Sequence, residues 1–485
     1  MPYQHGVRVL EQPTGVVAPI TGTAGLQVVI GTAPINLAEN PGAVTNVPIL
    51  ANTFAEAVAQ LGYSEDFEHY TLCQAMYASF KLCAVAPVVF INVLDPTVHK
   101  TDVAEAVTVA ISNLQGKISE SGILLSSVVV KNSNNALTVG TDYVLSFDDD
   151  GNLIITLTAT GAGAALTSVK VTYSKINPAA VTKSNIIGSY SASTGAETGL
   201  EVLRQVYPKF GMTPGLLLAP GWSQDADVAA VLAAKCEEIN GYFKCECVID
   251  IDSGASGAKV YTDVKTKKDA AGISSPHALA CWPCVKSGSK VLAMSAVMAA
   301  LTAYTDAAND DVPNLSPSNK SMPISGTCLA DGTEVALDQV QANVLNGGGI
   351  ATAINVNGWR SWGNNSAAYP STTDPKDRWW ACRRFFSWWG NSFILTYAQK
   401  VDDPANYRLI ESIVDSENIR GQAYVPDKCA GIRIEFLEDE NPVTDLLNGK
   451  ITFHQYLAPY TPAEDIVNIL EFDTETLQGA LFGGA

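Results

Sequence analysis

The order of apolar segments along the chain predicts buried strands that alternate with helices. Nearly continuous apolar runs at 25–34, 87–95 and 245–251 are typical of strands covered on both faces of a sheet. Between the first two runs, residues 64–83 carry aromatic and cysteine side chains at helical spacing, which predicts a helix. Strands and helices that alternate on this scale indicate a mostly parallel or mixed sheet covered by helices, so we predict an α/β core.

The same pattern continues through the second half of the chain. Further helices are expected at 225–240, 290–306, 338–345 and 404–420. Further strands are expected at 213–222, 278–286, 431–438 and 450–460, and short strands at the two ends, 5–12 and 465–477.

Residues 101–183 break this pattern. They contain no Cys and no Trp, and short runs of alternating apolar and polar residues replace the helices. The Asp150-Gly151 step between two such runs favours a hairpin, because both residues tolerate positive φ. We predict an inserted all-β, sandwich-like domain here.

These changes divide the 485 residues into several parts, as expected at roughly 100–200 residues per domain. The predicted parts are an N-terminal arm (1–20), the first part of the α/β region (21–100), the inserted β-domain (101–183), the main α/β region (184–350), a C-terminal α+β domain (351–463) and a C-terminal strand and arm (464–485).

The chain is acidic and has few charged residues for its size. Its 30 Lys and Arg against 49 Asp and Glu give a net charge of −19, which argues against nucleic-acid binding by neutralisation of phosphates. Only 16% of residues are charged, so partners are expected to cover part of the surface. No apolar run approaches the ~20 residues that span a bilayer, so no membrane insertion is expected. The first residues show no signal pattern, so we expect a cytosolic protein with reduced cysteines.

No residue pattern indicates catalysis, a metal or a cofactor, and we expect none. Cys281 and Cys284 have the spacing of a redox dithiol but lie in a strand-like run, so buried thiols are the better interpretation. Asp250 and Asp252 follow a predicted strand, where a helix cap or a turn is the commoner role. A hydrolase that uses these two carboxylates at the carboxyl ends of the parallel strands stays open as an alternative.

Charge is unevenly distributed in the C-terminal part. Residues 435–475 contain ten acidic side chains and one lysine, whereas 376–384 contain four basic residues and one acidic residue. Two solvated faces would explain this. Complementary patches that meet between copies of the protein would explain it too. The candidate residues of such a contact are Arg378, Arg383, Arg384, Glu438, Asp439 and Glu440.

Six of the eight tryptophans lie within residues 355–392. An exposed cluster of this kind would suit a carbohydrate- or surface-binding structural protein, which predicts that Trp359, Trp362 and the doublets at 379–380 and 388–389 face solvent. Alternatively, residues 379–389 pack a C-terminal core as a strand-to-helix segment.

Several segments together resemble one family, the tail sheath proteins of contractile-tailed bacteriophages and related contractile injection particles. The similar segments are "VNGWRSWGNNSAAYPSTTDPKDR" (356–378), "PNLSPSNKSMPISG" (313–326), residues 391–425 and the openings "HGVRVLEQPTG" and "VVIGTAP". Together these segments span nearly the whole chain outside 101–183, a region where sheath proteins vary by inserting extra domains. The residues that carry the family signature are Trp359, Arg360, Trp362, Gly363, Asn364, Ser316, Pro317, Asn319 and Lys320.

The resemblance implies a structural function without a cofactor. Subunits would polymerise as a helical homo-oligomer of stacked hexameric rings around a tail tube protein, with baseplate and tail terminator proteins as further partners. Contraction would drive the tube through a bacterial envelope. The protein would be part of a virion tail assembled in the host cytoplasm, with the inserted domain outside. Terminal arms would add strands to neighbouring subunits through Val7, Arg8, Val9, Leu10, Ile466, Val467, Ile469 and Leu470.

Overall fold

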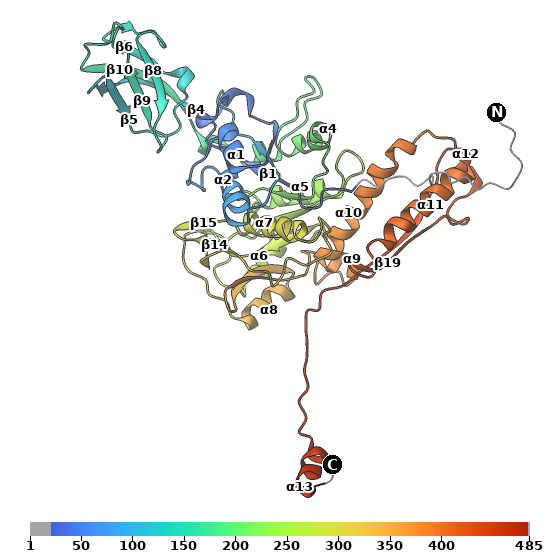
Figure 1. Ribbon diagram of the computed structural model, residues 1–485. Coiled ribbons are helices and arrows are strands. Elements are labelled where there is room, and N and C mark those ends of the chain that lie inside the picture. The colour runs from blue at the N-terminus through green and yellow to red at the C-terminus, as the bar shows by residue number, and fades with distance from the viewer. Residues whose placement is uncertain (1–20, 484–485) are drawn as a thin grey trace, which may run out of the picture.

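The computed structural model describes residues 21–483, and a mixed eight-stranded sheet lies at its centre (Figure 1). Six neighbouring strands are parallel, and one antiparallel strand closes each edge. The predicted α/β core is therefore confirmed. In spatial order the strands are β18 (Trp359–Trp362), β17 (Ile350–Asn355), β13 (Ala278–Cys281), β12 (Glu246–Asp250), β11 (Leu216–Leu218), β1 (Gln27–Gly31), β3 (Val88–Asn92) and β2 (Pro48–Ala51).

Helices cover this sheet and bury its central strands completely. α7 packs on β1, β11 and β12, and α2 packs beside it on β1. α5 packs on β11 and β12, and α3 packs against α5. All five residues of β1, β3 and β12 are buried, as expected for strands covered on both faces. The helices of this region are α1 (Phe54–Leu61), α2 (Leu72–Met76), α3 (Lys183–Ile187), α4 (Val206–Phe210), α5 (Ala226–Glu237), α6 (Val264–Ala270), α7 (Met294–Ala307) and α8 (Gln339–Gly347).

Two predicted helices begin later than their sequence pattern indicated. The helix expected from Ser64 starts at Leu72, because the Leu72 N–H donates to the Thr32 carbonyl and holds the preceding residues against the end of β1. It continues as a π-helical turn, Tyr77–Leu82. The helix expected from Lys290 starts at Met294, because β15 (Lys290–Leu292) first pairs with β14 (Cys284–Ser287). β14 pairs on its other side with β16 (Gly326–Cys328), which completes a small side sheet.

Residues 100–176 form two small sheets with a core of their own. They project from the main body at the upper left of Figure 1. Both ends of the segment lie together, because Lys100 of β4 pairs with Ile176 of β10. One sheet contains β4 (Lys100–Ala110), β10 (Ser168–Ile176), β6 (Val129–Asn132) and β7 (Asn135–Ala136), and the other contains β5 (Gln115–Ile118), β9 (Leu153–Leu157) and β8 (Tyr143–Phe147).

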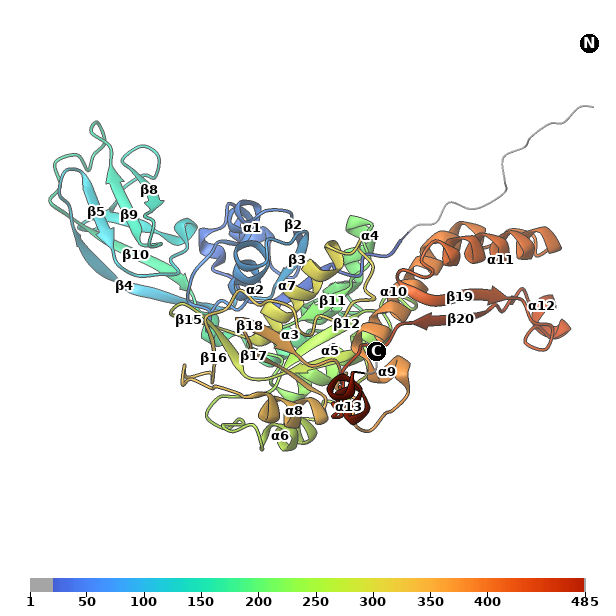
Figure 2. The ribbon, with the colours of Figure 1, turned by 60° about the horizontal axis from the view of Figure 1, so that its bottom comes forward.

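The C-terminal part extends from the opposite side of the body (Figure 2). It consists of helices and one hairpin, and Phe385, Trp388, Trp389 and Ile432 belong to its separate small core. Its elements are α9 (Pro375–Arg378), α10 (Trp380–Tyr397), α11 (Tyr407–Gln422), β19 (Cys429–Glu435), α12 (Val443–Leu447) and β20 (His454–Pro459).

The predicted strand at 465–477 is not formed in the single chain. Residues 465–473 are extended but unpaired, and α13 (Thr474–Phe482) follows, with the Asp473 side chain as its N-cap. The strand is absent because nothing in residues 21–483 offers this segment a hydrogen-bonding partner, and the capping residue favours a helix after it. The other terminal strand, predicted at 5–12, lies outside the described residues.

Candidate assembly surfaces

The two signature segments pack against each other beside β18. The Asn319 N–H donates to the Ser361 carbonyl (2.7 Å), and the Gly363 N–H donates to Ser318 Oγ (2.9 Å). Gly363 has φ 137°, and a Cβ there would lie 2.9 Å from Ala351 Cα, so this close approach requires glycine. The structure thus brings residues 40 positions apart into one unit.

The remaining signature residues belong to the same unit. Arg360 donates to the Asn319 carbonyl (3.0 Å), Ser316 donates to the Asn364 side chain, and the Lys320 N–H donates to Ser361 Oγ (3.1 Å). Pro317 supplies a carbonyl to the Ser361 hydroxyl, while Trp359 and Trp362 lie half-buried on β18. These contacts explain the segment as local structure.

Both tryptophan doublets are buried. Trp379, Trp380, Trp388 and Trp389 are at most 8% exposed, and the last two pack edge-on against Tyr424 after α11. The aromatic platform expected for a carbohydrate-binding protein is therefore wrong for the doublets. Packing of a C-terminal core, the other interpretation, is confirmed for Trp388 and Trp389, whereas Trp380 packs in the central core.

α10 also holds the first described residues of the chain. The Trp388 indole N–H donates to the Gly22 carbonyl (2.9 Å), and the Gly22 N–H donates to Ser392 Oγ (2.9 Å). Arg384 donates to the Ala24 carbonyl (3.1 Å). We call Gly22–Ala24 with these three side chains the arm-root clamp. The sequence pattern gave no sign of it, because its partners are more than 350 residues apart.

The proposed basic patch is largely internal. Arg384 is 1% exposed and forms an ion pair with Asp306 of α7, so its assignment to a surface between copies is wrong: the buried guanidinium needs its charged partner inside the chain. Arg383, also buried, pairs with Asp377 (3.2 Å). Arg378 is more accessible and pairs with Glu464 at the start of the C-terminal arm (3.0 Å).

The acidic half of the proposed contact lies elsewhere, in the loop between β19 and β20. Glu438 and Asp439 are exposed, while Glu440 bonds His454 at 2.6 Å. None of the three pairs with Arg378, Arg383 or Arg384 in residues 21–483, so a contact between copies remains a prediction for Arg378 and these carboxylates.

The C-terminal arm exposes a row of apolar side chains. The exposed fractions are 73–87% for Ile466, Val467, Ile469 and Leu470. A contiguous run of exposed apolar side chains is unusual on a monomer and indicates an interaction site. Val7, Arg8, Val9 and Leu10 of the N-terminal arm lie outside the described residues.

β20 offers an open strand edge and a groove beside it. It pairs with β19 only, so the groups on its other edge lack a ladder partner within the described chain. A cavity of about 490 Å³ follows β20, lined by residues 455–459 together with Lys376, Cys382 and Phe386. An extended apolar segment would fit this geometry.

Asp250 caps α7 from the carboxyl end of β12. Its carboxylate accepts hydrogen bonds from the Ser295 N–H (2.8 Å) and from the Ser295 and Ser223 hydroxyls. Burial raises the pKa of Asp250 above its usual value, against these hydrogen bonds, which lower it. A cavity of about 750 Å³ is lined by both Asp250 and Asp252, but the Asp252 carboxylate closes a turn through the Gly254 N–H (2.7 Å). Both carboxylates thus have the cap and turn roles that sequence analysis favoured.

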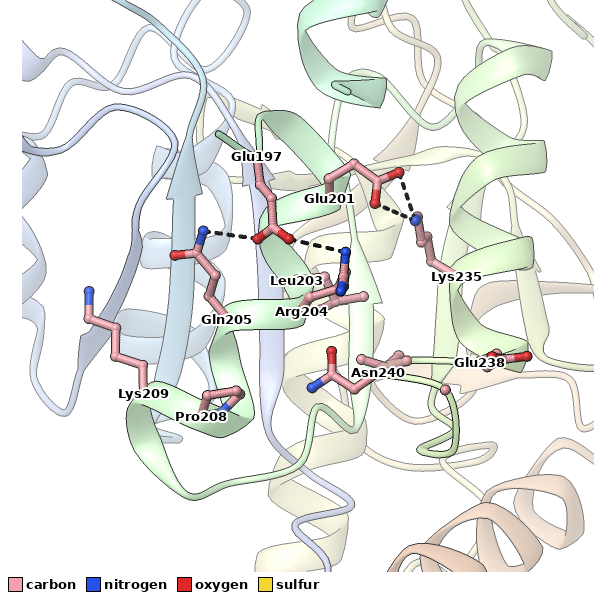
Figure 3. A pocket seen from close by; sticks show the side chains of 12 residues that line it. Glu197, Glu201, Leu203, Arg204, Gln205, Pro208, Lys209, Lys235, Glu238 and Asn240 are labelled. Carbon is pink, nitrogen blue, oxygen red and sulfur yellow. Dashed lines mark hydrogen bonds and ion pairs between the residues drawn. The ribbon is translucent and has the colours of Figure 1, made fainter. Parts of the chain in front are cut away.

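A second polar cavity, of about 790 Å³, lies near α4 and α5 (Figure 3). Four of its six charged side chains form ion pairs, Glu201 with Lys235 (2.8 Å) and Glu197 with Arg204 (3.2 Å), and the other two, Lys209 and Glu238, have opposite charges. This self-neutralised lining leaves little unpaired charge for a ligand.

The cysteines are packing residues. All ten are free thiols, and nine are buried. Burial raises the pKa of Cys284 to about 12, the opposite of what a reactive dithiol requires. Within 21–483, no three His, Cys, Asp or Glu side chains are arranged to bind a metal ion, and no helix has the length and apolar character to cross a bilayer.

α13 was not predicted, although the sequence contains a capping residue and helical spacing for it. Asp473 precedes the helix as a cap, and Leu477 and Leu481 have helical spacing. The predicted strand was extended to residue 477 because apolar residues occur throughout 466–472, directly before it.

Comparison with proteins of known sequence gives one relative that matches over nearly its full length and others that match over part of it. The chain is 28% identical over 493 residues to the tail sheath protein of Burkholderia phage BcepMu, with 98% of each chain covered. It is 26% identical over 302 residues to the tail sheath protein of Escherichia phage P2, with 59% of this chain and 70% of that protein covered. No protein-family model matches the sequence.

Solved structures show the same fold over nearly the whole chain. The sheath of an extracellular contractile injection system, PVC, in its contracted state superposes with a TM-score of 0.58 at 13% identity, covering 99% of both chains. The contracted helical sheath of the anti-feeding prophage superposes with a TM-score of 0.55 at 14% identity, covering 98% of this chain and 100% of that one.

Proposed function

We propose that this chain polymerises as stacked hexameric rings around a tail tube and contracts to drive that tube through a bacterial envelope. The proposal follows from its homology to contractile tail sheath proteins, which its sequence resemblance predicted. The observation that supports this most is the exposed apolar arm, 464–473, in a chain that also has an open strand edge at β20. The proposed function is structural and uses no cofactor.

Strand donation would link the subunits. Glu464 is paired with Arg378 on the body, so the free arm begins at residue 465. An extended chain spans about 3.3 Å per residue, so residues 465–473 can reach about 30 Å beyond the body, far enough to lie on another subunit. There, Ile466–Leu470 would pair with the free edge of β20 while its apolar side chains enter the groove beside that strand. The N-terminal arm, carrying Val7–Leu10, would leave from the arm-root clamp and act in the same way.

Such a link is heterologous, because different surfaces of two copies meet. Heterologous links form closed rings or open helical assemblies, and a sheath of stacked rings uses both. Main-chain hydrogen bonds can survive when the subunits rotate, so a sheath could change length without coming apart. The tube protein, the baseplate and a tail terminator are the partners that this role requires. Two structures of similar fold belong to the baseplate of the anti-feeding prophage. We place the protein in a virion tail or a related injection particle.

Electron microscopy of the purified protein, with and without a tube protein, tests the proposal. We expect hollow tubes or rings. Ile466→Asp/Ile469→Asp should abolish them without unfolding the subunit, because both side chains are exposed and would bury charge only in the assembly. Val139→Asp, an exposed position in the β-domain, is the matched control and should leave the tubes intact. Monomers at high concentration in the presence of tube protein would contradict the proposal.

A further inference from the structure

α13 stands free of the rest of residues 21–483. All its residues except Gly479 are exposed, and its apolar side chains Leu477, Leu481 and Phe482 are 46–83% exposed. In Figure 1 it hangs well below the body at the end of the extended arm. A helix of nine residues is marginal in water without tertiary contacts, so this apolar face is expected to be covered by another surface.

α8 also exposes apolar side chains along one face. Val340 and Val344 are 74% and 51% exposed and lie one turn apart, followed on the same helix by the exposed Gly347. Lys265 of α6 lies next to the end of this helix: a Cβ on Gly348 would be 3.3 Å from its Cγ. The lysine is exposed, and within the described part of the chain its one ion-pair partner is the similarly exposed Asp269.

The two helices are complementary when they run antiparallel. Leu477 then meets Val344 and Leu481 meets Val340, because both pairs are spaced by four residues. Asp473 and Glu475, in the first turn of α13, come to the end of α8 where Lys265 lies. Antiparallel packing also aligns the helix dipoles favourably.

The geometry points to α8 as the docking surface for α13 of a second copy of this chain. The inference rests on the proposed function, because strand donation by residues 466–470 carries α13 away from its own body and onto another subunit.

Charge argues against the other exposed apolar helix of the C-terminal part. α12 exposes Val443 and Leu447 at the same spacing. However, the exposed Glu438 and Asp439 shortly precede that helix in the sequence, and they would repel the acidic residues 471, 473 and 475 of the incoming segment.

Disulfide trapping in the full chain tests the docking. In assembled protein carrying Val344→Cys and Leu477→Cys, a mild copper–phenanthroline oxidant should remove two electrons and two protons per bond and produce a ladder of linked chains on non-reducing gels. Val443→Cys with Leu477→Cys is the matched control and should give no ladder. Each single variant shows how far the native thiols, nine of them buried, contribute.

Each outcome separates the two proposals. A ladder with the α8 pair alone supports the docking. A ladder with the α12 pair instead, a disulfide confined to one chain, or no cross-link in protein that forms tubes overturns it while the sheath function stands. A protein that forms neither tubes nor rings fails the proposed function itself. As a second measurement, Val340→Asp/Val344→Asp should lower the salt or temperature resistance of the tubes. These positions are exposed, so the subunit should still fold, and unchanged resistance would contradict the inference.

Discussion

Among single residues, Arg384 has the most consequential position in the chain. Its guanidinium joins α10 to Asp306 of α7 and to the Ala24 carbonyl, so one side chain connects three parts of the sequence. Removing one partner of a buried ion pair leaves the other charge unpaired in a poorly solvated place. Arg384→Met should therefore lower the free energy of unfolding by about 3–5 kcal/mol, measured by urea denaturation. Arg378→Met, which removes the more accessible pair with Glu464, should cost about 1 kcal/mol or less.

Lys268 is a buried cation that pairs with no carboxylate among residues 21–483. Its ammonium donates to the carbonyls of Gly348 (2.8 Å) and Tyr369 (3.2 Å), and burial lowers its pKa from 10.5 to about 8. Between these two pH values the unfolded chain holds a proton that the folded chain has released. Stability contributed by this lysine therefore rises with pH across the window.

Lys268→Met removes this titration. The unfolding free energy of the wild type relative to the variant should increase by about 3 kcal/mol between pH 8 and pH 10.5, in urea titrations at several pH values. Lys265→Met, at an exposed position of the same helix, should show no such trend. Parallel pH profiles for wild type and Lys268→Met would rule the idea out.

At the scale of elements, α10 is the link between the arm root and the C-terminal core. Trp388 and Trp389 are neighbours with similar burial, but only Trp388 donates its indole N–H to Gly22; the Trp389 indole has no hydrogen-bond partner among residues 21–483. Trp388→Phe should therefore speed amide hydrogen exchange at residues 22–26 and destabilise the fold by about 1 kcal/mol or more. Trp389→Phe is the matched control, and exchange at the arm root should stay slow in it.

Elements were predicted correctly where burial selects their residues. Their bounds were missed where a hydrogen bond to a distant residue sets them. β1, β3 and β12 followed from apolar runs because burial on both faces selects such residues. The start of α2 could not be found, because it depends on a bond from Leu72 to Thr32, 40 residues earlier. The signature segment was recognised from its residues, yet its role as a folding unit with Ser318 and Asn319 appeared only in three dimensions. Arg384 was misplaced for a related reason: sequence shows a charge but not the partner that allows its burial.

At the scale of the whole molecule, the chain has three parts, and each has a different role in the proposed sheath. The central sheet carries the signature unit and α8, the C-terminal part carries the open edge of β20, and the β-domain stands apart from both (Figure 2). Because the arm and the groove belong to the C-terminal side, removing the β-domain should not disturb strand donation.

The paired ends of that domain allow a clean test. Lys100 and Ile176 face each other across β4 and β10, so replacing residues 101–175 by Asn-Gly would close the hairpin with a two-residue turn. The domain has its own core, and Leu124 is its one residue in 101–175 that is counted with the central core, so the shortened subunit should fold with a modest loss of thermal stability. We expect electron microscopy to show tubes of smaller outer diameter. A folded but monomeric product would mean instead that the β-domain takes part in the contacts between subunits.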